Sequence, residues 1–312
     1  MSDLQPDNKY SRHPLLSLLL ILLMVGLGFV IVGPTVGFIF AMPFYDGSMM
    51  DMLADMQAVN DPAIKLPLYI TQGFATFIGL IVVPVLYLNL ERKSLAILFT
   101  KVEIDIVPII LTIVLVVVFM GVNSVFIDWN SSFEFPEFAK NFERWAREKE
   151  DIAAEMTAFL TQFDSIFEVA IAMIVIAVLP AVGEEIVFRG IIQNLFQKLT
   201  QNYHVSIWLA AILFSAIHLQ FFGFVPRLLL GALFGYLYYW SGNIILPMMA
   251  HFVNNGFSVL ALYFYQQGTV DYNLEEPEAV PLNVVAICTV LATGILYYFY
   301  KYYQRKTFTN PL

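Results

Sequence analysis

The stretch IFEVAIAMIVIAVLPAVGEEIVFRG at residues 166–190 decides the fold class. Its apolar run is long enough to cross a bilayer as a helix, yet three ionisable residues, Glu184, Glu185 and Arg189, follow that run. A charge left in hydrocarbon costs from about 3 to more than about 10 kcal/mol, so such residues pair, line a wet cavity or perform chemistry. The stretch therefore predicts a membrane helix that carries a polar site.

The composition of the whole chain is that of a membrane protein. Apolar residues make up 59% of the 312 residues and charged residues 13%, whereas soluble domains have about half and about a quarter. Runs of spanning length lie near residues 14–41, 67–90, 106–126, 166–183, 205–222, 225–241, 244–264 and 284–301. Because these runs are continuous and do not alternate, they favour an all-α, polytopic transmembrane helical bundle of about eight helices over a β-barrel.

The charges of the loops indicate an orientation. The net charge is −9, and the acidic loop at 265–283 contains no Lys or Arg. Since basic loops face the cytoplasm, we expect this loop outside and both termini inside. The segment 127–165 then carries basic residues outside, although acidic residues interleave with them. These patterns predict a multi-pass protein of the inner or plasma membrane with both termini in the cytoplasm.

We expect three parts along the chain. Residues 1–165 would form N-terminal transmembrane helices plus an extracytoplasmic amphipathic segment, because apolar side chains recur at close to a helical period over 135–163. That amphipathic helix could lie on the membrane, cap the bundle or bind a partner. Residues 166–264 hold nearly every unusual polar residue at membrane depth and would form the functional core. Residues 265–312 would form an acidic loop and a last transmembrane helix.

The two adjacent glutamates are expected to have different roles. Residues four apart share a helix face, so Glu185 and Arg189 can form an ion pair, while Glu184 points about 100° away. We expect Glu185 and Arg189 to orient the helix and Glu184 to be the general base. Pro180 lacks a backbone N–H, so it frees the carbonyl of Ile176 and allows a kink beside the site.

Two histidines at membrane depth complete the constellation. Glu184 and His218 lie equally far from a turn expected near residue 201, and equal distances in an antiparallel helical hairpin mean equal depth. A Glu–His pair at one depth can hold and deprotonate a water molecule. His251 and Asn255, four apart on a later helix, offer donors suited to stabilising an oxyanion.

Structural alternatives accompany each of these assignments. The Glu–Arg cluster could be only a buried ion pair, and His218 could form only a hydrogen bond between helices. Gly231 and Gly235 form a Gly-xxx-Gly pair, which indicates close helix packing more than function. Glu184, His218 and His251 could also form a zinc set of the kind that activates water. We favour a metal-free glutamate base, with no cofactor, over a zinc site.

Three motifs in order resemble those of the CAAX prenyl protease and bacteriocin-processing family, also called the CPBP or Abi family. The motifs are Glu184-Glu185-x-x-x-Arg189, Phe214-x-x-x-His218 and His251-x-x-x-Asn255. The resemblance covers residues 166–264 and implies an intramembrane endopeptidase of the type II CAAX kind, in which Glu184 works with His218 to activate water. It also implies an oxyanion site at His251 and Asn255. Because members of the family have been described both as metalloproteases and as glutamate proteases, the resemblance leaves the metal open.

These observations predict an intramembrane endopeptidase that hydrolyses a peptide bond of a membrane-associated or prenylated-type protein or peptide. The expected partners are membrane lipid and this substrate, and no nucleic acid. One alternative is a non-catalytic membrane binding or bacteriocin-immunity protein that uses the same polar cavity. A proton-coupled transporter is disfavoured, because the chain shows no inverted repeat and no matching pair of broken helices.

Overall fold

The fold is helical throughout the part of the chain that the structure describes. The computed structural model describes residues 12–59, 61–99, 105–270 and 280–309, and every regular element in these ranges is a helix. The α-helices are α1 (Pro14–Leu27), α2 (Gly33–Ala41), α3 (Met49–Ala58), α4 (Lys65–Phe77), α5 (Val83–Leu90), α6 (Ile106–Ser131), α7 (Lys140–Thr161), α8 (Ile166–Ala172), α9 (Leu179–Glu185), α10 (Gln193–Thr200), α11 (Tyr203–Ala216), α12 (Phe224–Ser241), α13 (Ile245–Gln266) and α14 (Leu282–Thr309). The acidic residues of the expected loop at 265–283 all fall within 271–279, outside the described ranges.

Other helical turns join or interrupt these α-helices. Four are π-helical: η1 (Gly28–Val32), η4 (Ile78–Val82), η7 (Met173–Val178) and η8 (Ile186–Ile192). Five are short 3₁₀ turns: η2 (Met42–Phe44), η3 (Pro62–Ile64), η5 (Leu95–Leu98), η6 (Glu137–Ala139) and η9 (Phe221–Gly223).

The expectation of a polytopic transmembrane bundle is confirmed. Among the described residues, 7 helical segments are long and apolar enough to cross a membrane, and α11 is a shorter apolar helix. The long segments are Pro14–Phe44, Pro62–Leu90, Ile106–Ser131, Ile166–Thr200, Phe221–Ser241, Ile245–Gln266 and Leu282–Arg305. Two expected boundaries were wrong. The run expected at 166–183 continues as one segment of 35 residues to Thr200, and the run expected at 205–222 ends as a helix at Ala216.

Prolines account for three of the four π-helical segments. The segments η1, η4 and η7 each end two residues before a proline, at Pro34, Pro84 and Pro180 respectively. A proline inside a helix has no N–H to donate, and its ring clashes with the carbonyl four residues earlier. A wider turn relieves that clash without ending the helix. The long spans therefore continue through their prolines.

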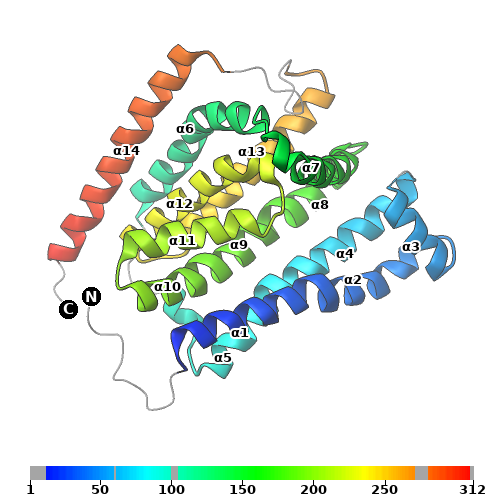
Figure 1. The fold of residues 1–312 in the computed structure, drawn as a ribbon, viewed down its shortest axis with the longest axis horizontal. Coiled ribbons are helices and arrows are strands. Elements are labelled where there is room, and N and C mark those ends of the chain that lie inside the picture. Colours follow the sequence, from blue (N-terminus) through cyan, green and yellow to red (C-terminus); the bar gives the residue numbers. More distant parts are fainter. Residues whose placement is uncertain (1–11, 60, 100–104, 271–279, 310–312) are drawn as a thin grey trace.

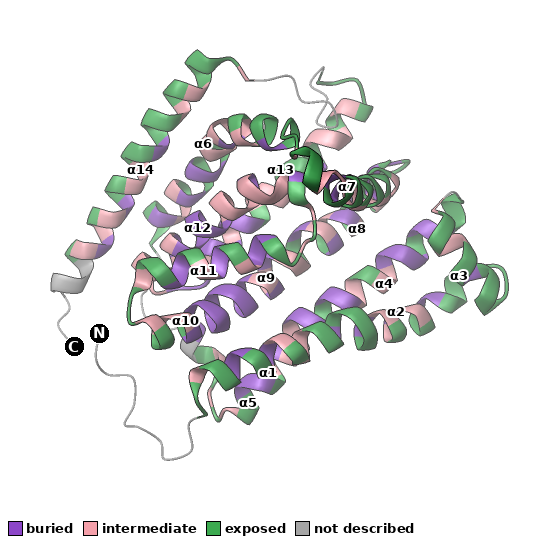
Figure 2. Ribbon diagram, in the orientation of Figure 1, coloured by how far each residue is buried: buried purple, intermediate pink, exposed green. Residues whose placement is uncertain are grey.

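The helices α1 to α5 form a hairpin, here called the front hairpin, which lies next to a bundle built around α8 to α13, here called the back bundle (Figure 1). Helices α2 and α4 run side by side, and α8 to α13 form the centre of the bundle. Gly33 allows the front helices to touch, because a Cβ at this position would lie 2.6 Å from the Cα of Ala75. Buried residues concentrate along α9, η8 and the inner faces of α11 and α12, whereas α14 is largely exposed (Figure 2).

The expected amphipathic segment forms α7, which lies at one end of the bundle (Figure 1). Glu150 accepts a hydrogen bond from the backbone N–H of Phe222 at 3.2 Å, and the guanidinium of Arg147 lies 4.1 Å from the centre of the Phe222 ring. The hydroxyl of Tyr69 in α4 donates to the carbonyl of Leu160 at the C-terminal end of α7. The helix thus packs on the rest of the protein through its middle and through its C-terminal end.

We expect Gly183→Ala to strain the junction between the front hairpin and the helix that carries the glutamates. A Cβ at Gly183 would lie 2.6 Å from the Cβ of Leu80 and 3.2 Å from its carbonyl oxygen. Overpacking of this kind typically costs about 1–3 kcal/mol. Thermal unfolding in detergent should show the loss. Gly73→Ala is the matched control, since its nearest neighbour would lie 3.6 Å away. Equal stability of the two variants would contradict the close approach.

The N-terminal turn of α7 should loosen in acid. Hydrogen bonds from Lys140, the backbone N–H of Phe135 and Arg147 lower the pKa of Glu143 to about 2. The pKa is lower in the folded chain than its ordinary 4.5, so its stabilisation is present above about pH 4.5 and is lost as the pH falls toward about 2. Limited proteolysis between these pH values should cut this turn progressively. Glu143→Gln should remove the pH dependence, and its persistence in that variant would assign it to another group.

Candidate active site

The adjacent glutamates lie in α9, between two π-helical segments of one long span. Pro180 explains the first segment, η7, but the second, η8, contains no proline. There the side-chain amide of Asn194 donates to the carbonyls of Arg189 (3.1 Å) and Gly190 (2.8 Å). These bonds satisfy carbonyls that a wider turn leaves without their usual partners. Single π-helical turns occur frequently at functional sites.

Arg189 is the buried centre of this region. Its side chain is 1% exposed, and its Nη1 donates to Oε1 of Glu185 at 2.9 Å, the contact that the four-residue spacing allows. Its Nη2 donates to the carbonyl of Gly231 at 2.9 Å. The guanidinium also lies 4.8 Å from the ring centre of Phe214 and 5.4 Å from that of Phe234. The charge is thus paired, hydrogen-bonded and stacked at once, as a buried charge requires.

The backbone carbonyls of two glycines in α12 accept hydrogen bonds from side chains of the long span that carries the glutamates. Gln193 donates to the carbonyl of Gly235 at 3.2 Å, one helical turn beyond the bond from Arg189 to Gly231. A Cβ at Gly235 would lie 2.9 Å from Oε1 of Gln193. The Gly-xxx-Gly pair, which the sequence indicated as a packing feature, therefore also exposes two carbonyls to polar partners.

Glu184 and Glu185 differ in their access to solvent. The side chain of Glu185 is 0% exposed, whereas that of Glu184 is 15% exposed. Glu185 is held by Arg189 and His251, and one oxygen of Glu184 lies 3.9 Å from Nε2 of His251. A distance of 3.9 Å is too long for a direct hydrogen bond but suits two groups that contact one small molecule. Glu184 is the carboxylate available for chemistry.

His251 lies between the two glutamates. Its Nδ1 is 2.8 Å from Oε1 of Glu185, and its Nε2 faces Glu184. The ring is stacked on Phe234 at 5.4 Å and meets the edge of Phe214 at 6.1 Å. Because a carboxylate accepts only, we assign the Nδ1 proton to the bond with Glu185. The sequence grouped His251 with an oxyanion site and did not predict its contact with both carboxylates.

His218 lies just beyond its helix, which corrects the expectation of a histidine buried within a span. Leu219 has a φ of 56°, a left-handed conformation that ends α11. Nδ1 of His218 lies 2.7 Å from the carbonyl of Phe214, so Nδ1 carries the proton and Nε2 is the free nitrogen. Within the described part of the chain, no hydrogen bond or ion pair joins His218 to Glu184.

The chain segments before and after the turn at residue 201 lie at matching depth close to the site. Gln201 adopts a left-handed conformation, and Asn202 caps the start of α11. Phe188 and Phe214 are equally far from residue 201, and their ring centres are 5.1 Å apart. Glu184 and His218 each follow one helical turn further from the loop. Equal distances from the turn therefore correspond to equal depth for these two segments, as the sequence predicted.

Asn255 connects α13 to the kink at Pro180. Its Nδ2 donates to the carbonyl of Ile176 at 3.1 Å, the carbonyl that Pro180 leaves without a partner. Asn254 donates to Oδ1 of Asn255 at 3.1 Å. The other N–H of the Asn255 amide donates no hydrogen bond to any described residue. Its role at an oxyanion site stays a prediction, beside this observed structural contact.

The described residues assemble no cluster of three His, Cys, Asp or Glu side chains suited to a metal ion. The alternative zinc set of Glu184, His218 and His251 is therefore not brought together in this structure.

Comparison with known proteins identifies the segment that contains all of these residues. Residues 166–257 match the family described as type II CAAX prenyl endopeptidase Rce1-like. This segment, less than a third of the chain, is similar to the Rce1-like domain, and we name it after that domain. The match confirms the resemblance found in the motif series and supports a CAAX-type membrane protease at the level of the family.

A curated relative matches part of the same chain. The uncharacterized protein YpbD of Bacillus subtilis (strain 168) is 32% identical over 85 residues, which cover 26% of this chain and 40% of that protein. The chain thus spans less than half of the relative that it matches. No solved structure matches the chain significantly.

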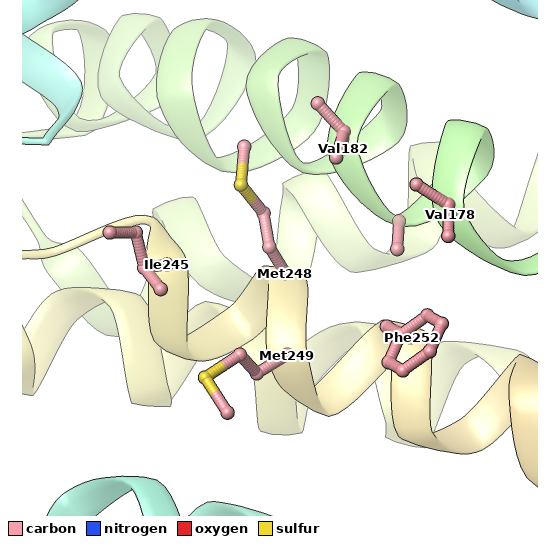
Figure 3. Close-up of a pocket in the computed structure, with 7 residues that line it drawn as sticks. Val178, Val182, Ile245, Met248, Met249 and Phe252 are labelled. Carbon is pink, nitrogen blue, oxygen red and sulfur yellow. The ribbon is translucent and has the colours of Figure 1, made fainter. Parts of the chain in front are cut away.

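An apolar pocket of about 300 Å³ lies between two helices of the Rce1-like domain (Figure 3). Its walls come from α9 with the end of η7 and from α13, the helices that carry the glutamates and His251. The lining residues are Val178, Ala181, Val182, Ile245, Met248, Met249 and Phe252. An apolar group can therefore lie against the same two helices as the polar residues.

The sequence analysis missed Arg227 in α12. Its Nη2 donates to Oε1 of Gln220 at 2.7 Å. A charged residue inside the span Phe221–Ser241 was the available signal, since such residues are rare and are usually functional.

Glu185→Gln should destabilise the Rce1-like domain by about 3–5 kcal/mol, because it leaves the Arg189 charge buried without its carboxylate. The double variant Glu185→Gln, Arg189→Gln should cost less than the sum of the single variants. Thermal unfolding in detergent measures both effects. Glu148→Gln, on the exposed face of α7, is the control. Additive losses would show that the two side chains are not energetically coupled.

Proposed function

We propose that this protein is an intramembrane endopeptidase that hydrolyses a peptide bond of a membrane-associated or prenylated-type protein or peptide. The observation that carries the proposal is the partly exposed Glu184 carboxylate, 3.9 Å from His251, on a helix held by the Glu185–Arg189 pair. The Rce1-like match supports the same class of reaction. The apolar pocket between the helices that carry Glu184 and His251 suits a substrate that arrives from the bilayer.

Glu184 would act as the general base. It takes a proton from a water molecule, and the resulting hydroxide attacks the carbonyl carbon of the scissile bond. The tetrahedral intermediate then collapses as the C–N bond breaks, and the proton passes from Glu184 to the leaving amine. The free Nε2 of His218 can share the proton of the same water, which is the partnership with Glu184 that the sequence indicated.

His251 and Asn255 would stabilise the oxyanion. Glu185 fixes the ring of His251, so that Nε2 faces Glu184 and can donate when it carries a proton. Asn255 has a second amide N–H beyond the one that it donates to Ile176. Donors held in place before the reaction typically contribute about 3–4 kcal/mol each to stabilisation of the transition state.

The apolar helices and the loop charges support a proposed arrangement in the membrane. The protein is an integral, multi-pass membrane protein by its apolar helices and its family. We further place both termini in the cytoplasm, and the start of α1 and the end of α14 lie at the same end of the bundle (Figure 1). The membrane lipid itself is then a partner, as is the peptide or protein substrate.

Glu184→Gln and His218→Ala should each reduce cleavage by about 100-fold or more, because each removes a proton-transfer group. The assay incubates purified protein in liposomes with a library of membrane-anchored peptides and detects new termini by mass spectrometry. Glu148→Gln is the control for a surface carboxylate, and a chelator arm tests for a metal.

The outcomes separate the catalytic proposal from its alternative. Cleavage by wild type and the control, lost in both variants, supports a glutamate-dependent peptidase. A Glu184→Gln protein that cleaves as fast as wild type contradicts the assignment of the base. Full biological activity of Glu184→Gln would instead favour a binding or immunity protein, and loss of cleavage on chelation would favour a metal.

A further inference from the structure

Arg227 is a cation that the proposed chemistry does not use. It lies in the first turn of α12, within an apolar span, and its Nη2 donates to the side chain of Gln220. Its Nη1 is buried and forms no hydrogen bond with any described residue. A guanidinium has five N–H donors and keeps its charge at all ordinary pH values. Leaving such a donor buried without an acceptor is unfavourable, so this group is poised to bind an anion.

Arg227 belongs to the same polar region as the candidate site. Its hydrogen-bond partner Gln220 is two residues from His218 in the chain, so Arg227 lies on the His218 side of the site. Its charge also contributes to the electrostatics of Glu184 and His218.

The nearest acidic residue on α7 does not neutralise this charge directly. Glu150 also interacts electrostatically with Arg227, but its carboxylate accepts from the backbone N–H of Phe222. Within the described ranges no ion pair joins Glu150 to Arg227. Gln220, which accepts a hydrogen bond from the guanidinium, and Gly223, which lies next to it, are both uncharged.

Gly223 provides room for the guanidinium. A Cβ at this position would lie 3.2 Å from Nη2 of Arg227 and 3.7 Å from its Cζ. The first of these distances is tighter than ordinary van der Waals contact, so a side chain here would shift the guanidinium by a few tenths of an ångström. The position thus offers a means of moving Arg227 without changing its charge.

We propose that Arg227 binds a carboxylate of the substrate and thereby selects where the chain is cut. The inference rests on the proposed function, because it treats the neighbouring Glu184 as the group that activates water. A planar guanidinium matches a carboxylate with two parallel hydrogen bonds. The carboxylate is either the C-terminus of the substrate or an acidic side chain near it. Arg227 is a specificity-determining residue, and the spacing between it and Glu184 sets the distance from carboxylate to scissile bond.

Matched substrate pairs test the proposal. Membrane-anchored peptides are made with a free or an amidated C-terminus, and in a second series with Asp and Glu or with Asn and Gln near the C-terminus. Wild type should prefer one carboxylate series by about 10- to 100-fold in kcat/KM, the range expected for hydrogen bonds to a charged group. The series that shows the preference identifies the source of the carboxylate.

Variants then assign the preference to Arg227. Arg227→Gln should abolish it through a rise in KM for the carboxylate peptides, so that carboxylate and neutral peptides are cleaved with the same kcat/KM. Arg227→Lys keeps the charge but cannot form the two parallel hydrogen bonds, and Gly223→Ala shifts the guanidinium. Both variants should therefore reduce the preference. Arg144→Gln, an exposed arginine of α7, is the matched control. A wild type without preference, or an Arg227→Gln protein that retains it, overturns the proposal.

A binding measurement keeps this inference separate from the peptidase proposal. Tripeptide libraries with free or amidated C-termini, and with acidic or neutral side chains, are added to Glu184→Gln protein, and stabilisation against thermal unfolding is measured. A carboxylate-dependent shift that disappears when Arg227→Gln or Arg227→Lys is added supports the site even if wild type cleaves nothing. Equal shifts with and without Arg227 refute it, whatever the result of the cleavage assay.

Discussion

The ion pair between Glu185 and Arg189 is the interaction on which the rest of the site depends. Both side chains are almost fully buried, and Arg189 also donates to the carbonyl of Gly231. Breaking such a pair leaves an uncompensated charge in a medium that cannot solvate it. The pair therefore fixes the rotation, relative to α12, of the helix that carries the two glutamates. That rotation in turn points Glu184 out of the helix packing and toward His251.

The site combines residues that are fixed with one that is accessible. Glu185, Arg189 and the ring of His251 are held by at least two contacts each. Glu184 is the partly exposed member, with no hydrogen bond from another described residue. A rigid surround with one free carboxylate is the arrangement that general base catalysis needs, because the base must reach water while its neighbours keep their positions.

Much of this could be predicted from the sequence, because periodicity and spacing determine it. The helical class, the contact between Glu185 and Arg189, the turn at residue 201 and the free carbonyl of Ile176 all follow from local rules. The end of α11 before His218 could not, since nothing in the apolar run signals a left-handed Leu219.

Contacts between distant segments also lay beyond local rules. The capture of the Ile176 carbonyl by Asn255 and the place of His251 between two carboxylates depend on how the helices pack. The same holds for the unpartnered Nη1 of Arg227.

The segment of 35 residues that carries the glutamates measures about 50 Å at 1.5 Å per residue, against about 30 Å of hydrocarbon. Such a helix accommodates its excess length by tilting or kinking, and its packing against the neighbouring helices sets the angle at which Glu184 is presented to the bilayer.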